Sequence, residues 1–389
     1  MMGMEPRERV VASLNHEEPD RVPRDLGSSL VTGIHRGAYK KYLDYTGEKL
    51  DGKIETRDLI QQLADVEGRH LERWAVDTRG VFSNPPSNWE LAIEETETHH
   101  EFIDQWGIKW SKPKKSGLYY DITESPLAGD IEVEDIEKHD WPDPVDPARF
   151  KGLRDEINKI NQGRRYFIFF TGLGPGIYEM CQWIRGHREF WLDLIRSPEL
   201  SKTLLNKITE LKLKFWERAL TEIGDLIDTV YMADDLATQE NLQISIDTYR
   251  NFIKEPHYRV FHYIKENAPT PIHIFYHSDG AVRELIPDLI EAGIDVLNPV
   301  QVSARGMNPS ELKEEFGDKL SFWGAGGNPH GALVNETSEK VEEEISSRIE
   351  ALAEGGGWVF APIHNIQPDV PPENFEAMWN ALDGYGSYD

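Results

Sequence analysis

His273-Ile-Phe-Tyr-His277-Ser-Asp279-Gly280 is an apolar run that ends abruptly on polar residues. It follows Pro271, and its composition predicts a buried strand. A helix-like stretch at 281–292 comes directly after it, so the strand ends where a His-x-Asp pair begins. In β/α proteins, active sites are built at the carboxyl ends of parallel strands. We therefore expect His277 and Asp279 to lie at an active site.

A second apolar run, Gly357-Trp-Val-Phe-Ala-Pro-Ile-His364-Asn365, also ends on a histidine. If the chain closes into a barrel, His364 can meet His277 and Asp279 at one end of it. Two imidazoles and one carboxylate form a suitable ligand set for a divalent metal such as zinc. The alternative reading is that His277 and Asp279 form a hydrogen-bonded or capping pair without a metal.

Eight segments of the chain have the pattern of strands, and helical patterns separate most of those in its second part. The segments are 21–27, 74–82, 165–171, 229–233, 273–277, 295–301, 320–326 and 357–364. Eight β/α units with polar residues at the strand ends predict an α/β fold, a TIM (β/α)8 barrel. We expect a single domain over 1–389, with an N-terminal helical region made of a helix at 6–14 and mostly helical structure over 33–73.

The pattern changes between residues 85 and 147, where short alternating stretches and turns replace the β/α rhythm. The segment ends in a stiff connector, Trp141-Pro-Asp-Pro-Val-Asp-Pro. It predicts an insertion of β-hairpins that could form a lid over the barrel. An edge subdomain without a role in function is the alternative.

Composition excludes several classes of function. The formal net charge is −27 and the pI is near 4.9, which argues against a surface for nucleic acid or anionic membranes. The acidity fits small molecules or a partner with a basic face, or it simply keeps the protein soluble. The single cysteine, Cys181, excludes an intrachain disulfide, and its neighbours indicate a core thiol. We find no signal peptide or apolar span and expect a cytoplasmic protein.

Other polar residues at the predicted strand ends are candidates for catalysis or substrate binding. Asp234 and Asp235 are adjacent, so we expect one to orient substrate and the other to cap a helix beginning near Thr238. The further candidates for substrate binding are Arg24, Asp25, Gln239, Asn298, Gln301 and His330.

Several motifs together resemble a known family. They are Glu8-Arg9-Val-Val-Ala-Ser-Leu-Asn-His-Glu-Glu-Pro-Asp20-Arg21-Val-Pro23, Asp104-Gln-Trp106-Gly107, Asp234-Asp235-Leu-Ala-Thr-Gln239, Leu285-Ile-Pro-Asp-Leu-Ile-Glu-Ala-Gly-Ile-Asp295-Val-Leu-Asn298-Pro-Val-Gln301 and Asn365-Ile-Gln-Pro-Asp-Val-Pro-Pro372-Glu-Asn374. They span nearly the whole chain and resemble the uroporphyrinogen decarboxylase superfamily, in particular its corrinoid-dependent methyltransferase branch. The resemblance implies a TIM barrel with its active site at the carboxyl ends of the strands.

The resemblance also implies a metal site with altered ligands. In the coenzyme M methyltransferases of this branch, a His-x-Cys pair and a later Cys hold zinc. Here His277 matches the His, while Asp279 and His364 stand where the two Cys would be. A site of nitrogen and oxygen donors is harder and suits an ether better than a thiol.

The decarboxylases themselves look less similar. They carry an Arg-Gln-Ala-Gly-Arg-Tyr motif that grips the carboxylates of the tetrapyrrole, whereas this chain reads Arg24-Asp-Leu-Gly-Ser-Ser-Leu-Val-Thr. Without the arginine cluster, several buried anions would stay unpaired, at a cost of several kcal/mol per ion.

The leading hypothesis from the sequence is a methyltransferase component of a corrinoid system, such as an O-demethylase. It would move a methyl group between a methoxylated small molecule, such as an aromatic one, and a corrinoid protein. The partner would carry the cobalamin, because this chain has no Asp-x-His-x-x-Gly motif. A decarboxylase and a non-catalytic ligand-binding barrel are the alternatives. The methyl donor, the direction of transfer and the oligomeric state, including a homo-oligomer, stay open.

Overall fold

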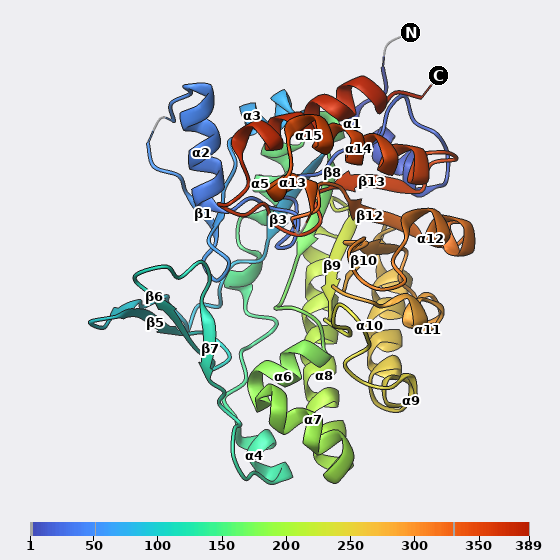
Figure 1. Cartoon of the computed structure of the whole chain (residues 1–389). Coiled ribbons are helices and arrows are strands. Elements are labelled where there is room, and N and C mark those ends of the chain that lie inside the picture. Colours follow the sequence, from blue (N-terminus) through green and yellow to red (C-terminus); the bar gives the residue numbers. More distant parts are fainter. Residues whose placement is uncertain (1–2, 51, 330, 389) are drawn as a thin grey trace.

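A barrel of parallel strands forms the centre of the molecule (Figure 1). The computed structural model describes residues 3–50, 52–329 and 331–388. Within them, seven strands pair in the order β13-β12-β11-β10-β9-β8-β3, each parallel to its neighbour. They are β3 (Thr78–Phe82), β8 (Phe167–Thr171), β9 (Thr229–Ala233), β10 (His273–His277), β11 (Val296–Asn298), β12 (Ser321–Ala325) and β13 (Trp358–Ala361). Each lies inside a predicted strand segment.

The segment 21–25 closes the barrel between β13 and β3. The N–H of Asp25 donates to the carbonyl oxygen of Phe360 over 2.8 Å, on the β13 side. On the other side, the N–H of Asp77 donates to the carbonyl oxygen of Arg24 over 2.9 Å. The segment therefore acts as the eighth strand, and the predicted TIM barrel is confirmed.

A buried carboxylate holds this closure in place. Asp77 is fully buried, and its Oδ1 lies 2.5 Å from the guanidinium of Arg9. Its Oδ2 accepts from Arg21 over 2.9 Å and from the backbone N–H of Arg24 over 2.9 Å. One side chain thus ties the start of β3 to the closing segment and to the N-terminal helix.

The N-terminal helix α1 (Pro6–Leu14) spans the predicted residues and covers the amino-terminal end of the barrel. Its Ser13 hydroxyl donates to the carbonyl oxygen of Trp358 at the start of β13 over 2.8 Å. Its Val10 and Leu14 pack into a buried cluster of the barrel interior. The other buried members of this cluster are Val31, Phe167, Phe169, Tyr231, Ala233, Phe275, Val296, Trp323, Val359 and Ala361. The interior is therefore filled with side chains from end to end.

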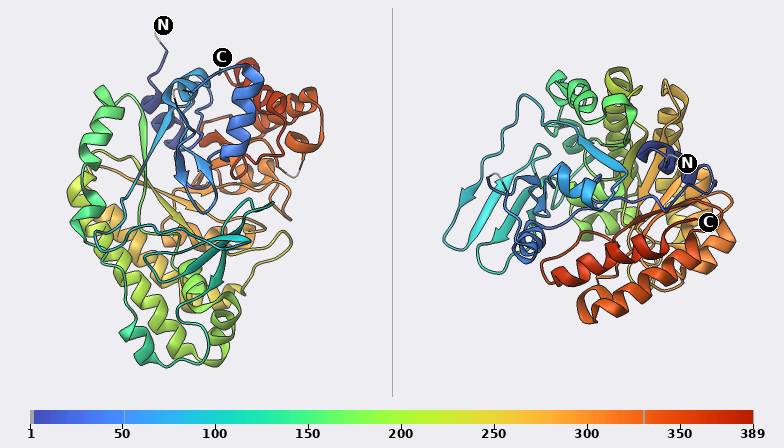
Figure 2. Two further views of the ribbon diagram at one scale, coloured as in Figure 1. Left: turned by 90° about the vertical axis from the view of Figure 1, so that its left-hand side faces the viewer. Right: turned by 90° about the horizontal axis from the view of Figure 1, so that it is seen from above.

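Helices surround the strands, and the two chain ends lie on the same side of the molecule (Figures 1 and 2). The principal helices are α5 (Leu153–Ile160), α6 (Tyr178–Arg185), α7 (His187–Arg196), α8 (Pro198–Ile223), α10 (Lys254–Asn267), α11 (Ile286–Ala292), α12 (Pro309–Phe316), α14 (Ser338–Leu352) and α15 (Pro372–Tyr385). Cys181 lies buried in α6 with a free thiol, as the sequence indicated. Across the described residues, none of the helices combines the length and the apolar character that crossing a bilayer requires.

The prediction of mostly helical structure over 33–73 is wrong for its middle. Helices α2 (Arg36–Thr46) and α3 (Gly68–Arg73) flank two short antiparallel strands, β1 (Thr56–Asp58) and β2 (Leu63–Ala64). The carboxylate of Asp58 accepts from the backbone N–H groups of Ile60 and Gln61 over 3.1 and 3.3 Å. Such side-chain bonds offer the backbone an alternative to the helix.

A four-stranded antiparallel sheet lies beside the barrel between β3 and α5 (Figure 1, teal). Its strands are β4 (Glu94–Glu95), β5 (His99–Ile103), β6 (Lys109–Pro113) and β7 (Asp121–Glu124), followed by α4 (Val133–Lys138). The sheet lies in the range where the sequence predicted β-hairpins. Phe102 and Trp110 are buried on its inner face with their rings stacked at 6.4 Å.

Substituting Asp77 should destabilise the whole fold. In Asp77→Ala, Arg9 and Arg21 would keep their charges in a buried place without the carboxylate, which costs about 3–5 kcal/mol. Urea unfolding followed by tryptophan fluorescence measures this loss. Asp44→Ala is the control, because Asp44 pairs with Lys40 on an exposed helix surface and such pairs contribute at most about 1 kcal/mol. An equal loss in both variants would contradict a special role for Asp77.

Candidate active site

Three potential metal ligands come together at the carboxyl ends of β10 and β13. His277 is the last residue of β10, Asp279 follows it in the next loop, and His364 follows β13. Each offers a ligand atom, and these atoms all lie within 4.8 Å of one another. The Nε2 of His277 is 3.9 Å from a carboxylate oxygen of Asp279, and the two imidazole centroids are 5.7 Å apart. The predicted convergence is confirmed, while metal binding stays a prediction.

The ring of His277 is held in one orientation by Asn298, at the end of β11. Its Nδ1 lies 2.6 Å from the amide oxygen of Asn298, which fits an Nδ1–H donor. The amide nitrogen of Asn298 in turn donates to the carbonyl oxygen of Trp323 over 2.8 Å. The lone pair of His277 therefore sits on Nε2, facing the other ligands. Asn298 is fully buried behind His277, so the prediction that it binds substrate does not fit its position.

His364 and Asp279 carry signs of a functional constraint. The backbone of His364 has a φ of 61°, in the left-handed region that non-glycine residues seldom occupy. Burial lowers the pKa of His364, against the opposing influence of Asp279, so its imidazole is kept neutral. Among the described residues, the buried Oδ1 of Asp279 has no hydrogen-bond partner. The neutral imidazole of His364 and the unsatisfied carboxylate oxygen of Asp279 are groups to which a cation could bind.

The ligand cluster opens into a pocket of about 520 Å³, a usual size for a small-molecule site. The barrel contributes Tyr231, Asp235 and the two histidines, and the loop after β8 contributes Gly172 to Pro175. The opposite wall comes from the antiparallel sheet. The aromatic lining residues are Phe82, Trp89, Phe102, Trp106, Trp110, Trp183 and Tyr231. The site is therefore an apolar chamber with a polar end.

Asp235 is the predicted catalytic residue that the structure places in the pocket. Its Oδ1 accepts from the backbone N–H of Asp279 over 3.0 Å and lies 3.9 Å from the Nε2 of His277. Burial raises the pKa of Asp235, His277 opposes this rise, and the Asp279 carboxylate adds to it. Asp235 can therefore contact a ligand bound beside His277.

Asp234, the other predicted catalytic residue, faces away from the pocket. It is fully buried, and its carboxylate accepts from the backbone N–H groups of Ile177 and Glu179 over 3.2 and 2.6 Å at the start of α6. It also lies 2.6 Å from the Nε2 of His257. The structure therefore does not bring Asp234 into the pocket, and its catalytic role stays a prediction that this position does not support. The capping prediction has the wrong helix, because residues 238–241 form a turn and Asp234 caps α6.

Arg24 and Asp25 do not line the pocket either. Neighbouring residues of an extended segment point to opposite sides. Arg24 points outward to Asp383, 2.7 Å away. Asp25 points into the filled barrel interior, where Thr78 and Trp323 donate to its carboxylate over 2.6 and 3.0 Å. The structure therefore does not bring Arg24 and Asp25 to the pocket, and their contacts here are with the fold.

Gln239 and Gln301 are also outside the pocket. The side-chain oxygen of Gln301 accepts from the N–H of Gly280 over 2.7 Å and so supports the loop that carries Asp279. Gln239 is exposed on the loop after β9. His330 lies outside the described residues.

Sequence reasoning missed several residues that line the pocket. Glu179, from the first turn of α6, is one of them, and burial raises its pKa well above the usual value, with the nearby Asp235 and Asp234 adding to the shift. Asp58, Trp106 and Trp110 are others. The concentration of tryptophans within the predicted insertion was a usable signal, because aromatic walls are typical of ligand pockets.

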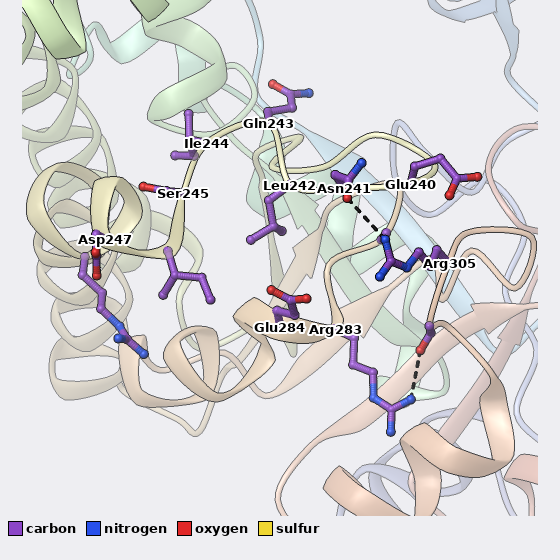
Figure 3. Close-up of a pocket in the computed structure, with 14 residues that line it drawn as sticks. Glu240, Asn241, Leu242, Gln243, Ile244, Ser245, Asp247, Arg283, Glu284 and Arg305 are labelled. Atoms are coloured by element: carbon purple, nitrogen blue, oxygen red, sulfur yellow. Dashed lines mark hydrogen bonds between the residues drawn. The ribbon is translucent and has the colours of Figure 1, made fainter.

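A second, more open depression of about 810 Å³ lies over the loops that follow β9, β10 and β11 (Figure 3). Its arginines already have partners. Arg283 pairs with Glu315 over 2.7 Å, Arg250 pairs with Asp288 over 2.8 Å, and Arg305 reaches Asn241 over 3.5 Å. None of the three predicted metal ligands lines it, so we assign the active site to the chamber beside His277.

Comparison with known proteins identifies the family. Residues 122–385, more than half of the chain, match the family described as uroporphyrinogen decarboxylase (URO-D). The chain belongs to the uroporphyrinogen decarboxylase family. The uroporphyrinogen decarboxylase of Saccharophagus degradans is 22% identical over 81% of this chain and 89% of that protein. The match to the enzyme of Pseudoalteromonas translucida is 34% identical but spans 20% of this chain and 21% of that one.

The fold also matches a solved methyltransferase from Methanosarcina mazei. The TM-score is 0.64, and the match covers 98% of this chain and 99% of the other at 17% sequence identity. At that identity the likeness shows a shared fold. Family membership supports an enzyme.

The buried Asp58 should make stability fall as pH rises. Burial raises the pKa of Asp58 from 3.8 to about 6, so between these values the folded state binds more protons than the unfolded one. The stabilisation is fully present below pH 3.8 and is lost as pH rises through 6. Asp58→Asn removes this effect and should be more stable than the wild type by up to about 3 kcal/mol at pH 7.5, with little difference at pH 4. Urea unfolding at both pH values tests this, and a pH-independent difference would contradict it.

Proposed function

We propose that this chain is the methyltransferase component of a corrinoid-dependent system. It transfers a methyl group between a methoxylated small molecule, bound in the aromatic chamber, and a cobalamin carried by a separate corrinoid protein. His277, Asp279 and His364 hold a zinc ion at the polar end of the chamber. The antiparallel sheet acts as a lid over the barrel mouth.

The observation that carries this proposal is the ligand cluster at the end of the chamber. Two histidines and a carboxylate leave a fourth tetrahedral position open, as in catalytic zinc sites. The residues fit the metal on three counts. The Nε2 of His277 is free because Nδ1 bonds to Asn298, the ring of His364 is kept neutral, and the buried Oδ1 of Asp279 lacks a partner among the described residues.

Each part of the chain has a separate task in this reaction. The aromatic walls exclude water and hold the apolar body of the substrate against the cluster. Asp235 lies beside His277 and contacts the oxygen that loses its methyl group. A bound zinc would supply Lewis acidity that favours negative charge on that oxygen. The bond between oxygen and methyl breaks, the methyl passes to the cobalt of the partner, and the oxygen takes up a proton.

Decarboxylation of a porphyrinogen is the second candidate, because the curated relatives carry that name. The charge of the pocket argues against it. Among the described lining residues Arg57 is the one Lys or Arg, whereas Asp58, Asp104, Glu179 and Asp235 are acidic. A substrate with several carboxylates would meet repulsion and have few cationic partners here.

Metal content tests the proposal directly. The wild type, purified without chelator, should hold about one zinc per chain, since its ligand set fits catalytic zinc. His277→Ala and His364→Ala should both lose it, because each removes one of the protein ligands. His262→Ala is the matched control, since this histidine stacks on Tyr258 on the outer helix α10 and should leave the metal in place. Plasma mass spectrometry measures the content.

The activity assay separates the two candidates. The chain alone should not turn over methoxylated substrates until a reduced corrinoid protein is added, after which formation of the methylated corrinoid is followed by its absorbance. A folded wild type without metal would remove zinc from the proposal. Turnover of a porphyrinogen by the isolated chain would overturn methyl transfer in favour of decarboxylation.

Asn298→Ala should weaken zinc binding without removing a ligand. The Nδ1 of His277 then loses its anchor, and loss of such a partner lowers metal affinity about 10- to 100-fold. Competition with a chromophoric chelator measures the affinity, and circular dichroism checks the fold. Asn374→Ala is the control, because Asn374 is equally buried but bonds to the backbone of Leu333 and Glu336. Unchanged affinity in Asn298→Ala would show that Asn298 does not orient the ligand.

A further inference from the structure

The walls of the chamber form a corner suited to a flat ring. Trp110, on the antiparallel sheet, and Trp183, on α6, meet with ring centroids 5.2 Å apart and planes at 84°. Phe102 stacks against Trp110, with an angle of 14° between the rings. A planar aromatic ligand can lie against one of these faces and present its edge to the other, which is the preferred geometry of aromatic contacts.

Trp110 and its neighbour Trp106 are held in place before a ligand arrives. Asp104 accepts from the indole Nε1 of Trp110 over 2.8 Å and from the backbone N–H of Trp106 over 2.8 Å. Trp106 and Trp110 are each 3% exposed. The Trp110 side of the corner is therefore preorganised, and packing a ring against it costs little ordering of this side chain.

The ionisable side chains around this corner are almost all acidic. Asp58 and Glu179 line the chamber, and Asp235 lies at its polar end. The guanidinium of Arg57 is already engaged, because it lies 2.6 Å from Asp65 and 4.9 Å from the ring centroid of Phe82. An anionic substituent would therefore meet like charges in a partly desolvated place and would find no free cation among the described lining residues.

We propose that the chamber selects aryl methyl ethers that carry no carboxylate. The aromatic ring packs into the corner of Trp110 and Trp183, and the methoxy group points to His277. A ring hydroxyl can donate to Glu179, whereas a ring carboxylate is repelled. This inference rests on the proposed methyl transfer and adds to it the charge and shape of the small-molecule substrate.

Two ligands that differ by one carboxylate test the selection. They are 2-methoxyphenol and 4-hydroxy-3-methoxybenzoate, titrated into the full-length protein at pH 7.5 in a calorimeter. The wild type should bind the phenol at least about tenfold more tightly, a difference of about 1.4 kcal/mol. Equal or tighter binding of the benzoate, or no binding of either ligand, would overturn the inference.

Matched variants locate the cause of the selection. Asp58→Asn should bring the ratio of the two dissociation constants closer to one, because Asp58 lines the chamber and, with a pKa of about 6, carries a negative charge at pH 7.5. Glu240→Gln removes the same charge from the open depression of Figure 3 and should leave the ratio as it is. An equal change in both variants would assign the effect to net charge and contradict selection by the chamber.

A second pair of variants tests the ring contact. Trp110→Phe should weaken binding of 2-methoxyphenol, because a smaller ring opens the corner. Trp191→Phe changes a tryptophan that is 40% exposed on α7 and should not weaken it. If both variants, or neither of them, bind 2-methoxyphenol more weakly than the wild type, the assignment of the ring contact is contradicted.

Two different results distinguish a failure of this inference from a failure of the proposed function. A chain that holds zinc at the three ligands and methylates the corrinoid, yet binds the benzoate as tightly as the phenol, overturns the charge selection alone. A chain that prefers the phenol but holds no zinc overturns the metal-assisted methyl transfer and leaves the ligand class standing.

Discussion

The buried carboxylate of Asp77 is the constraint on which the barrel depends. A barrel needs its first strand to bond on both sides, and here that strand is a short segment with few backbone hydrogen bonds of its own. Asp77 compensates by binding Arg9, Arg21 and the backbone of Arg24 at once. Because the barrel closes, the ends of β10 and β13 approach each other, and His277 meets His364.

A second buried group sets the wall of the chamber. Asp234 joins the end of β9 to the start of α6, and His257 and Tyr249 extend this connection with contacts of 2.6 and 3.1 Å. Gly176 permits the approach, because a Cβ there would lie 1.5 Å from the carbonyl oxygen of Ala233. The position of Glu179 in the chamber therefore follows from contacts behind it, and Asp234 matters to the site without facing it.

The fold could be predicted from sequence because buried parallel strands are continuous apolar runs, and His277 and His364 mark where two of them end. The direction in which individual side chains point could not be predicted from the sequence. Asp25 turns into the barrel interior and Asp234 turns toward α6, since tertiary hydrogen bonds decide these orientations. Trp110 lies in a separate sheet, and the concentration of tryptophans there indicates a ligand wall without indicating which of them reaches the barrel mouth. Predicted strand ends thus gave good candidate ligands and poor candidate substrate contacts.

The filled barrel interior also limits the route by which ligands can reach the site. Helix α1 covers one end, and rings such as Phe169, Phe275 and Trp323 occupy the space above it, so no ligand can cross the barrel. A small substrate and a large protein partner would therefore use the same mouth. In the proposed methyl transfer, the small molecule would enter before the partner docks and the partner would leave before the product escapes, so the architecture would set the kinetic order of the two substrates.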